Sequence, residues 1–341
     1  MLLSTQLAYA GDVRAAADEI ASWESAGLDV VWVAEAYGFD APSVMGYLAA
    51  RTERMQIGSA ILPIYSRTPA LIAQTAAGVD HLTGGRAILG IGSSGPQVVE
   101  GWHAVPFDRP LARTREIIDI CRRVWRRERL VNDGLYNIPL PADRGTGRGK
   151  PLKLINHPVR VNIPIYVASL GTRNVEMTAE LADGWIPNMF LPERAADVWG
   201  DALTSGGEKR SGELASLQVV AGGLVAIGED VEHLRDLGRG EYALYIGGMG
   251  ARDRNFYFNI ACSYGYADAA ERIREAFLAG RKEEAEAAVP SELLELTSLI
   301  GTAGYVKERI EAYREAGVTI LNVRPVGGDP VGELAQLRAW L

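Results

Sequence analysis

Apolar residues recur at helical spacing in one stretch of the chain and then form a continuous run in the next. Between Asp12 and Gly27 they stand three or four positions apart, which predicts a helix capped by Asp12 and ended by Gly27. The apolar run at 29–34 predicts a strand buried on both faces. Further copies of this pattern are found at 80–91, 182–189 and 302–323. The chain is therefore predicted to repeat one helix–strand unit.

The pattern gives eight candidate strands. They are 2–8, 29–35, 55–62, 86–92, 163–169, 184–189, 217–226 and 318–324. Strands that alternate with helices predict parallel βαβ units, and eight such units predict an α/β fold of the (β/α)8 TIM barrel type. We expect one domain over 1–341, with insertions near 130–162, after strand four, and near 228–301, after strand seven.

Composition narrows the class of protein. The chain is 48% hydrophobic and 23% charged, as in ordinary globular proteins, and no apolar run is long enough to predict a membrane span. The net charge of −8 argues against nucleic acid as a partner and leaves a small-molecule substrate. Two cysteines in no metal or redox spacing, without a signal-peptide pattern, predict a reducing cytoplasm.

Barrel enzymes carry their sites at the carboxyl ends of the strands, and this rule selects a few residues. Strand five leads into Ser169, Gly171 and Thr172, where a helix is predicted to begin. Hydroxyls, a glycine and free helix N–H groups suit a phosphate, while plain helix capping by Thr172 is the alternative. The glycines at 90–95 match the GxGxxG pattern of dinucleotide-binding folds, but they follow the fourth strand and no acidic strand end follows at the expected distance. Close approach of the backbone to a bound ring explains them better.

Glu35 ends the second apolar strand and is therefore expected to be partly buried. A buried carboxylate can act as acid or base or accept a hydrogen bond from a cofactor. The alternative is a salt bridge at the barrel rim, with an arginine as the partner. The four histidines show no ligand spacing, so no metal site is predicted, although His103 follows Trp102 in a loop that could line a pocket.

Several segments together resemble the luciferase-like oxidoreductases. They are 57–75, 80–86, 90–92, 165–169 with 182–185, and 300–302 with 313–318. Within that superfamily, residues 245–250 and 255–257 are similar to the branch that uses coenzyme F420, which includes methylenetetrahydromethanopterin reductases. These segments span nearly the whole predicted barrel.

The resemblance implies a cofactor site. A non-prolyl cis peptide at Ser59-Ala60 would support the back of the deazaflavin ring, with Leu62 beside the ring. Its polar edge would meet Ser93 and Ser94, and Glu35 would lie near it. The residues implied to hold the phosphate-bearing tail are Ala168, Ser169, Leu170, Gly171 and Thr172. A homodimer or larger assembly is also implied.

Two departures narrow the chemistry that the resemblance implies. F420-dependent sugar-phosphate dehydrogenases carry a histidine and a glutamate where this chain has Ala36 and Gly95, so oxidation of sugar phosphates by their mechanism is disfavoured. Gln6 stands at the end of strand one. A carboxylate at this position would suit a protonated pterin substrate better than this uncharged amide does.

The predicted function is hydride transfer between C5 of F420 and an organic substrate, with Glu35, Tyr37 or water as proton donor. Trp102, Tyr245 and Met249 are candidates for the substrate pocket. Two alternatives remain open. One is an FMN-dependent monooxygenase on the same barrel, and the other is a non-catalytic carrier of a flavin or F420.

Overall fold

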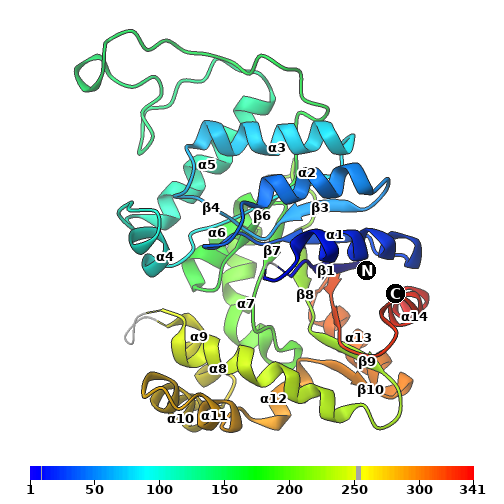
Figure 1. Cartoon of the computed structure of the whole chain (residues 1–341). Helices are drawn as coiled ribbons and strands as arrows, with labels where there is room; N and C mark the ends of the chain where they lie inside the picture. The colour runs from blue at the N-terminus through cyan, green and yellow to red at the C-terminus, as the bar shows by residue number, and fades with distance from the viewer. Residues whose placement is uncertain (9, 251–254) are drawn as a thin grey trace.

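The computed structural model describes residues 1–8, 10–250 and 255–341 and forms a closed parallel barrel (Figure 1). The barrel strands are β1 (Leu2–Gln6), β2 (Val30–Val33), β3 (Gln56–Ser59), which β4 (Leu62–Pro63) continues, β5 (Ala87–Gly92), β6 (Ile165–Ala168), β7 (Gly184–Ile186), β8 (Gln218–Ala221) and β11 (Ile320–Asn322). Pairing of β1 with β11 and of β3 with β5 closes the ring. The eight predicted strands and the barrel are confirmed.

Helices cover the outside of the barrel between successive strands (Figure 1). They are α1 (Val13–Ser22), α2 (Ala41–Arg51), α3 (Pro69–Thr83), α5 (Pro110–Trp125), α6 (Thr172–Leu181), α7 (Pro192–Lys209), α13 (Ala303–Glu315) and α14 (Pro330–Trp340). A short helix, α4 (Pro96–Gly101), lies directly after β5. Asp12 caps α1 and Thr302 caps α13 through side-chain oxygens, as the sequence predicts.

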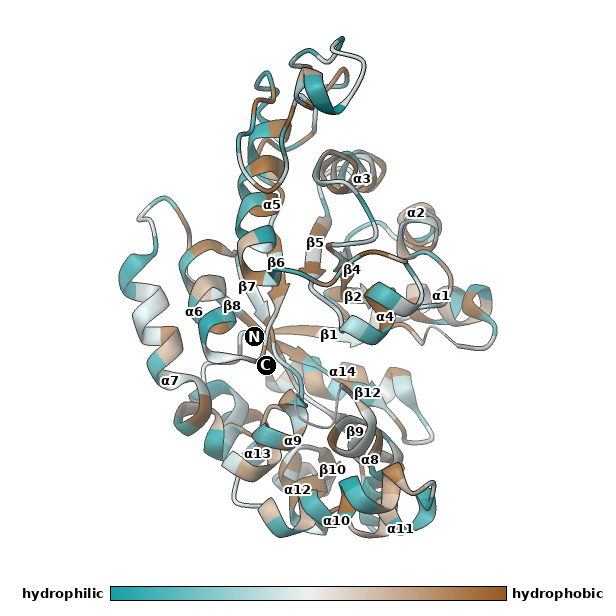
Figure 2. Cartoon of the chain, turned by 90° about the vertical axis from the view of Figure 1, so that its left-hand side faces the viewer, coloured by the Kyte–Doolittle hydropathy of each residue, from teal (hydrophilic) through white to brown (hydrophobic). Residues whose placement is uncertain are grey.

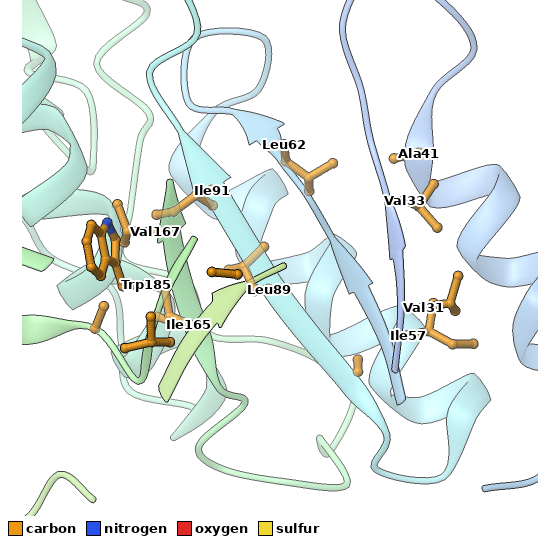
Figure 3. Packing of buried hydrophobic residues seen from close by; sticks show 14 of the residues in the cluster. Val31, Val33, Ala41, Ile57, Leu62, Leu89, Ile91, Ile165, Val167 and Trp185 are labelled. Atoms are coloured by element: carbon orange, nitrogen blue, oxygen red, sulfur yellow. The ribbon is translucent and has the colours of Figure 1, made fainter. Parts of the chain in front are cut away.

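Both faces of the barrel strands are apolar, which explains their continuous hydrophobic runs. One set of side chains, including Val31, Leu89 and Val167, packs in the main core outside the strands (Figure 3). The alternate set forms a separate buried cluster inside the barrel, in which the rings of Trp32 and Tyr166 lie 5.6 Å apart.

Aspartates that precede the strands fix the opposite end of the barrel from the strands' carboxyl ends. Asp29 accepts a hydrogen bond from Leu3 N at 2.8 Å, and Asp183 accepts one from Ile165 N at 2.9 Å. Asp80, fully buried at the end of α3, accepts from Ala87 N at 3.2 Å. The recurring aspartate in the helix–strand units is thus a strand anchor.

A small parallel sheet that the sequence did not predict joins the insertion after the seventh barrel strand to a later part of the chain. Its strands β9 (Leu224–Ile227) and β10 (Leu299–Gly301) belong to the insertion, and β12 (Arg324–Pro325) follows the eighth barrel strand. The predicted strand 217–226 splits into β8 and β9 at Gly222 and Gly223. A Cβ on Gly222 would come within 2.1 Å of Asn322 O, and one on Gly223 within 2.0 Å of Thr297 O. The chain can pass between these carbonyls only as glycine.

Short helices complete this insertion. They are η3 (Glu232–Gly238), α8 (Arg239–Gly248), α9 (Phe256–Ser263), α10 (Ala267–Leu278), α11 (Lys282–Ala287) and α12 (Ser291–Leu296). Their buried side chains form a second hydrophobic cluster of their own. The assignment of 1–341 to a single domain stays a prediction.

The insertion after the fourth strand is an arm, residues 126–164, that projects from the barrel beyond α5 (Figures 1 and 2). It contains a bridge between Asn132 and Ile138 and one short 3-10 helix, η2 (Ala142–Arg144). At its end, Arg160 forms an ion pair with the buried Asp80 and donates to Ala87 O at 2.6 Å. Among the residues described, no helix combines the length and apolarity needed to cross a membrane.

Candidate active site

The carboxyl ends of the barrel strands form a mouth bordered by small side chains. Ala34, Ala60 and Ala168 are half-buried there, and Gly92 ends β5. A Cβ at Gly92 would lie 3.1 Å from Ile61 Cγ1 and 3.5 Å from Ala168 Cβ, so these segments already pack closely. Small residues of this kind let a flat ligand approach the backbone.

The segment between β3 and β4 breaks the third strand at the mouth. It contains a cis peptide bond between Ala60 and Ile61, so the predicted position, Ser59-Ala60, is wrong by one residue. Ala60 N still donates to Val33 O at 2.8 Å, which holds the segment beside β2. Ile61 is half-buried and stands against Gly92.

Ser59 and Leu62 flank this segment, and neither offers its side chain to the mouth. Ser59 is fully buried, and its hydroxyl is hydrogen-bonded to the backbone of Gly90. Leu62 is 1% exposed and belongs to the core between strands and helices (Figure 3). The side chains that the segment presents are those of Ala60 and Ile61.

Ser93 and Ser94 follow β5 at the same end of the barrel. Ser93 is half-buried and Ser94 is exposed, with a left-handed φ of 55°. Their one described contact is a 3.3 Å bond from the Ser93 hydroxyl to Ser94 O. Both hydroxyls therefore remain available to a polar ligand edge.

The loop from Ala168 to Thr172 ends at the N-terminus of α6. Ser169 is buried and its hydroxyl bonds to Thr178 Oγ1 at 2.9 Å, so it serves the protein. Gly171, and not Thr172, is the cap residue, and no side chain caps the helix. Asn174 N donates to Gly171 O at 2.9 Å, so the N–H groups of Thr172 and Arg173 keep the capacity to bind an anion, and the exposed Thr172 hydroxyl adds to it.

Phe256, at the start of α9, lies directly over this loop. A Cβ on Gly171 would meet the Phe256 ring at 2.9 Å, so a larger residue there would push this ring aside. Asn255 caps α9 and donates to Tyr245 O and Ile246 O, at 3.0 and 2.8 Å, which ties α9 to α8. The sequence pointed to this segment only by resemblance and gave Phe256 no role.

Glu35 is bound to Arg67 in a bidentate ion pair. Oε2 accepts from Arg67 Nη2 at 2.8 Å and from Ala41 N at 2.8 Å, and Oε1 accepts from Arg67 Nη1. This is the salt bridge at the barrel rim that the sequence left as the alternative. Both oxygens act as acceptors, so the pair links the loop after β2 to the segment before α3.

Exposed aromatic side chains lie on the loops that follow β2 and β5. Tyr37 and Trp102 are 68% and 64% exposed, and their rings lie 6.5 Å apart. His103 is half-buried, with a buried Nε2 that has no hydrogen-bond partner in the structure.

Tyr166 lies inside the barrel, below the mouth. Burial raises the pKa of its phenol, which therefore stays protonated.

Within the residues that the structure describes, no three histidine, cysteine or carboxylate side chains are placed to hold a metal ion. The candidate site has four parts. They are the segment between β3 and β4, the hydroxyls of Ser93 and Ser94, the N-terminus of α6 without a side-chain cap, and the Tyr37–Trp102 pair.

Comparison with known proteins identifies the family. The model of the luciferase-like monooxygenase family matches residues 2–319, and the chain belongs to this family. It is 39% identical, over 99% of both chains, to a Mycobacterium tuberculosis protein named as a coenzyme F420-dependent oxidoreductase. It is 27% identical to 5,10-methylenetetrahydromethanopterin reductase of Archaeoglobus fulgidus, over 91% of this chain and 87% of that one.

Among solved structures, the coenzyme F420-dependent tetrahydromethanopterin reductase of Methanopyrus kandleri has the same fold. The TM-score is 0.82 at 21% identity, over 100% of this chain and 98% of that one.

Proposed function

We propose that this protein is a coenzyme F420-dependent oxidoreductase that transfers a hydride between C5 of the deazaflavin and an organic substrate. The 39% identity over 99% of both chains to a protein named for that cofactor carries the proposal. The small-residue mouth and the uncapped α6 fit a flat ring with a phosphate-bearing tail. When bound, F420 supplies the hydride chemistry, and the protein supplies position and shielding.

Each part of the mouth has one role in this proposal. Ala60 and Ile61 support the back of the ring, while Ser59 and Leu62 hold their segment from behind. Ser93 and Ser94 bind the polar edge of the ring. Ala168, Leu170, Gly171 and Thr172 form the cradle for the tail, with Ser169 fixing its shape through Thr178.

Glu35 positions the loop after β2 and does not supply the proton. Its two oxygens accept three hydrogen bonds, two from Arg67 and one from Ala41 N. Of the other predicted donors, Tyr37 carries an exposed hydroxyl in the same loop. A proton at the substrate therefore comes from Tyr37 or from water at the mouth.

The direct test of the reaction is isotope transfer. F420 reduced with deuterium at C5 is mixed with the protein and a panel of enones, imines and pterins. Deuterium in the product, formed without oxygen, supports the proposal. Oxygen consumption with reduced FMN and no transfer from F420 would instead identify an FMN-dependent monooxygenase. Binding without turnover of any acceptor would indicate a carrier.

We also infer a homodimer in which the arm contacts the second copy. Leu152, Ile155 and Val161 on the arm are 66%, 89% and 62% exposed. Residues 126–160 carry eight arginines and lysines against three acidic residues, in a chain of net charge −8, so the arm complements the acidic body of another copy. Ile155→Asp should convert dimers to monomers in light scattering, and a monomeric wild type would contradict this. The cytoplasmic location stays a prediction.

A further inference from the structure

The Tyr37–Trp102 pair lies beside the segment proposed to support the cofactor ring. Tyr37 follows β2 and Trp102 follows β5, and both strands pair with β3, which leads into Ala60 and Ile61. The loops that carry the two rings therefore flank that segment from either side. In Figure 1, α4, which ends beside Trp102, lies at the same end of the barrel as α9, and Figure 2 views the molecule from this side.

Exposed apolar side chains that gather at one place mark binding sites, whereas ones scattered singly are ordinary. Tyr37 and Trp102 contact each other across two loops, with ring centroids 6.5 Å apart and planes tilted by 56°. Most of the surface of each side chain is open to solvent. A planar ligand group that stacks on this pair would bury apolar area and gain the geometry-dependent attraction between aromatic rings.

The charged groups on the same two loops are acidic or already paired. Glu35 is bound to Arg67, Asp40 caps α2, and Glu100 accepts from Phe107 N at 3.1 Å. Asp108 is bound to Arg113 and Arg109. Over residues 34–40 and 93–109, which the structure describes throughout, no unpaired arginine or lysine faces this aromatic pair. Of these carboxylates, Asp40 and Glu100 form no ion pair among the described residues, so an anionic substrate would meet repulsion from them.

We propose that the substrate of this oxidoreductase presents a planar, uncharged aromatic or conjugated group to the Tyr37–Trp102 pair, and that the surrounding carboxylates exclude anionic analogues. The inference rests on the proposed function, because it names the substrate class of that same site. It assigns Trp102 and Tyr37 to substrate specificity, separate from the residues that would hold the cofactor.

A matched pair of ligands tests this directly. The F420-loaded protein is titrated by calorimetry with 4-phenylbut-3-en-2-one and with the analogue that carries a carboxylate at the para position. The neutral ketone should bind at least tenfold more tightly than the carboxylate. Equal or tighter binding of the carboxylate overturns the inference, and so does a failure of both ligands to bind.

Variants locate the effect. Trp102→Ala should lose about tenfold in affinity for the neutral ketone, while Trp102→Phe should keep most of it, since stacking needs a ring. Leu82→Ala is the control. Leu82 is also exposed, at 65%, but it lies in the last turn of α3, at the opposite end of the barrel from the mouth. An unchanged affinity in Trp102→Ala, or an equal loss in Leu82→Ala, overturns the assignment.

The cofactor titration keeps the two proposals apart. Trp102→Ala should bind F420 with wild-type affinity. If wild-type protein binds no F420, the proposed function fails. If F420 binds normally and the neutral ketone is not preferred, only the substrate inference fails.

Discussion

The Ser59 hydroxyl and the Gly90 backbone form a reciprocal pair in which Oγ donates to Gly90 O at 2.8 Å and accepts from Gly90 N at 2.9 Å. β3 has ended at Ser59, and β5 has no ladder partner at this level until β4 begins. The serine side chain therefore replaces the missing strand contact. It also fixes the start of the segment that carries Ala60 and Ile61 to the mouth.

Ser59→Ala should lower the free energy of unfolding, because it leaves two buried backbone groups of Gly90 without partners. The cost expected is about 1–3 kcal/mol for each such group. Urea denaturation measures it, with Ser22→Ala as the control, since Ser22 is an exposed serine bonded only to Glu19 O. F420 affinity should fall as well, and a variant as stable as wild type would contradict the role given to Ser59.

Gly90→Ala should be more damaging than a glycine replacement at an open position. A Cβ at Gly90 would lie 1.8 Å from Ser59 O, so the backbone must shift. Gly46 in α2 has nothing within 4 Å of a Cβ and is the control. We expect destabilisation of about 1–3 kcal/mol or more for Gly90→Ala, and neutral or slightly higher stability for Gly46→Ala. Equal stabilities in thermal unfolding would contradict the packing described.

Asp80→Ala should destabilise the protein by about 1–3 kcal/mol, because it leaves the buried Ala87 N without an acceptor and Arg160 without its counter-charge. The loss should also release the end of the arm, which limited proteolysis detects as faster cleavage after residue 150. Asp197→Ala breaks an exposed pair with Arg194 and should cost less than about 1 kcal/mol. Similar costs for the two variants would contradict the anchoring role.

Glu35→Gln should lower thermal stability but leave the pH profile of turnover with the same ionisations as wild type. The reason is that Glu35 is engaged as an acceptor by Arg67 and Ala41 and acts through the loop that it holds. Arg67→Gln should produce the same phenotype. Loss of one limb of the pH profile in Glu35→Gln alone would show that it is the acid or base.

Glu333 makes stability depend on pH in a defined direction. Burial raises the pKa of this carboxyl, although Ile227 N donates to it at 3.3 Å. A raised folded-state pKa means that the native state holds the proton more tightly, so this contribution to stability is present at low pH and is lost as pH rises above the ordinary glutamate range. Glu333→Gln should therefore gain stability relative to wild type between pH 4.5 and 7. A constant difference over that range would contradict this.

The sequence predicted the barrel because four of the strands follow a helix end marked by glycine or aspartate, and those residues have direct local roles. It could not orient the side chains of β4, since Leu62 lies in a run that is apolar on both faces and shows no alternation. The bond between the Ser169 and Thr178 hydroxyls could not be predicted either, because it depends on how the strand end and α6 pack together. β10 was missed because its three residues pair only with β9, which lies more than seventy residues away.

The partner of Glu35 also lay beyond the sequence. Arg67 is 32 residues away, and nothing local distinguishes it from other arginines. The placement of the candidate site at the carboxyl ends of the strands depends on the barrel rule and not on individual contacts, and it stays a prediction. Phe256 and Ile61 emerge only from packing against Gly171 and Gly92.

The most direct measurement of the central claim is the affinity of the purified protein for F420 and for FMN, titrated side by side. The account predicts saturable F420 binding in the micromolar range or tighter, with FMN weaker by at least tenfold. It also predicts that Gly171→Val, whose side chain would collide with Phe256 at the tail cradle, weakens F420 binding strongly. Micromolar FMN binding without measurable F420 binding would contradict the claim.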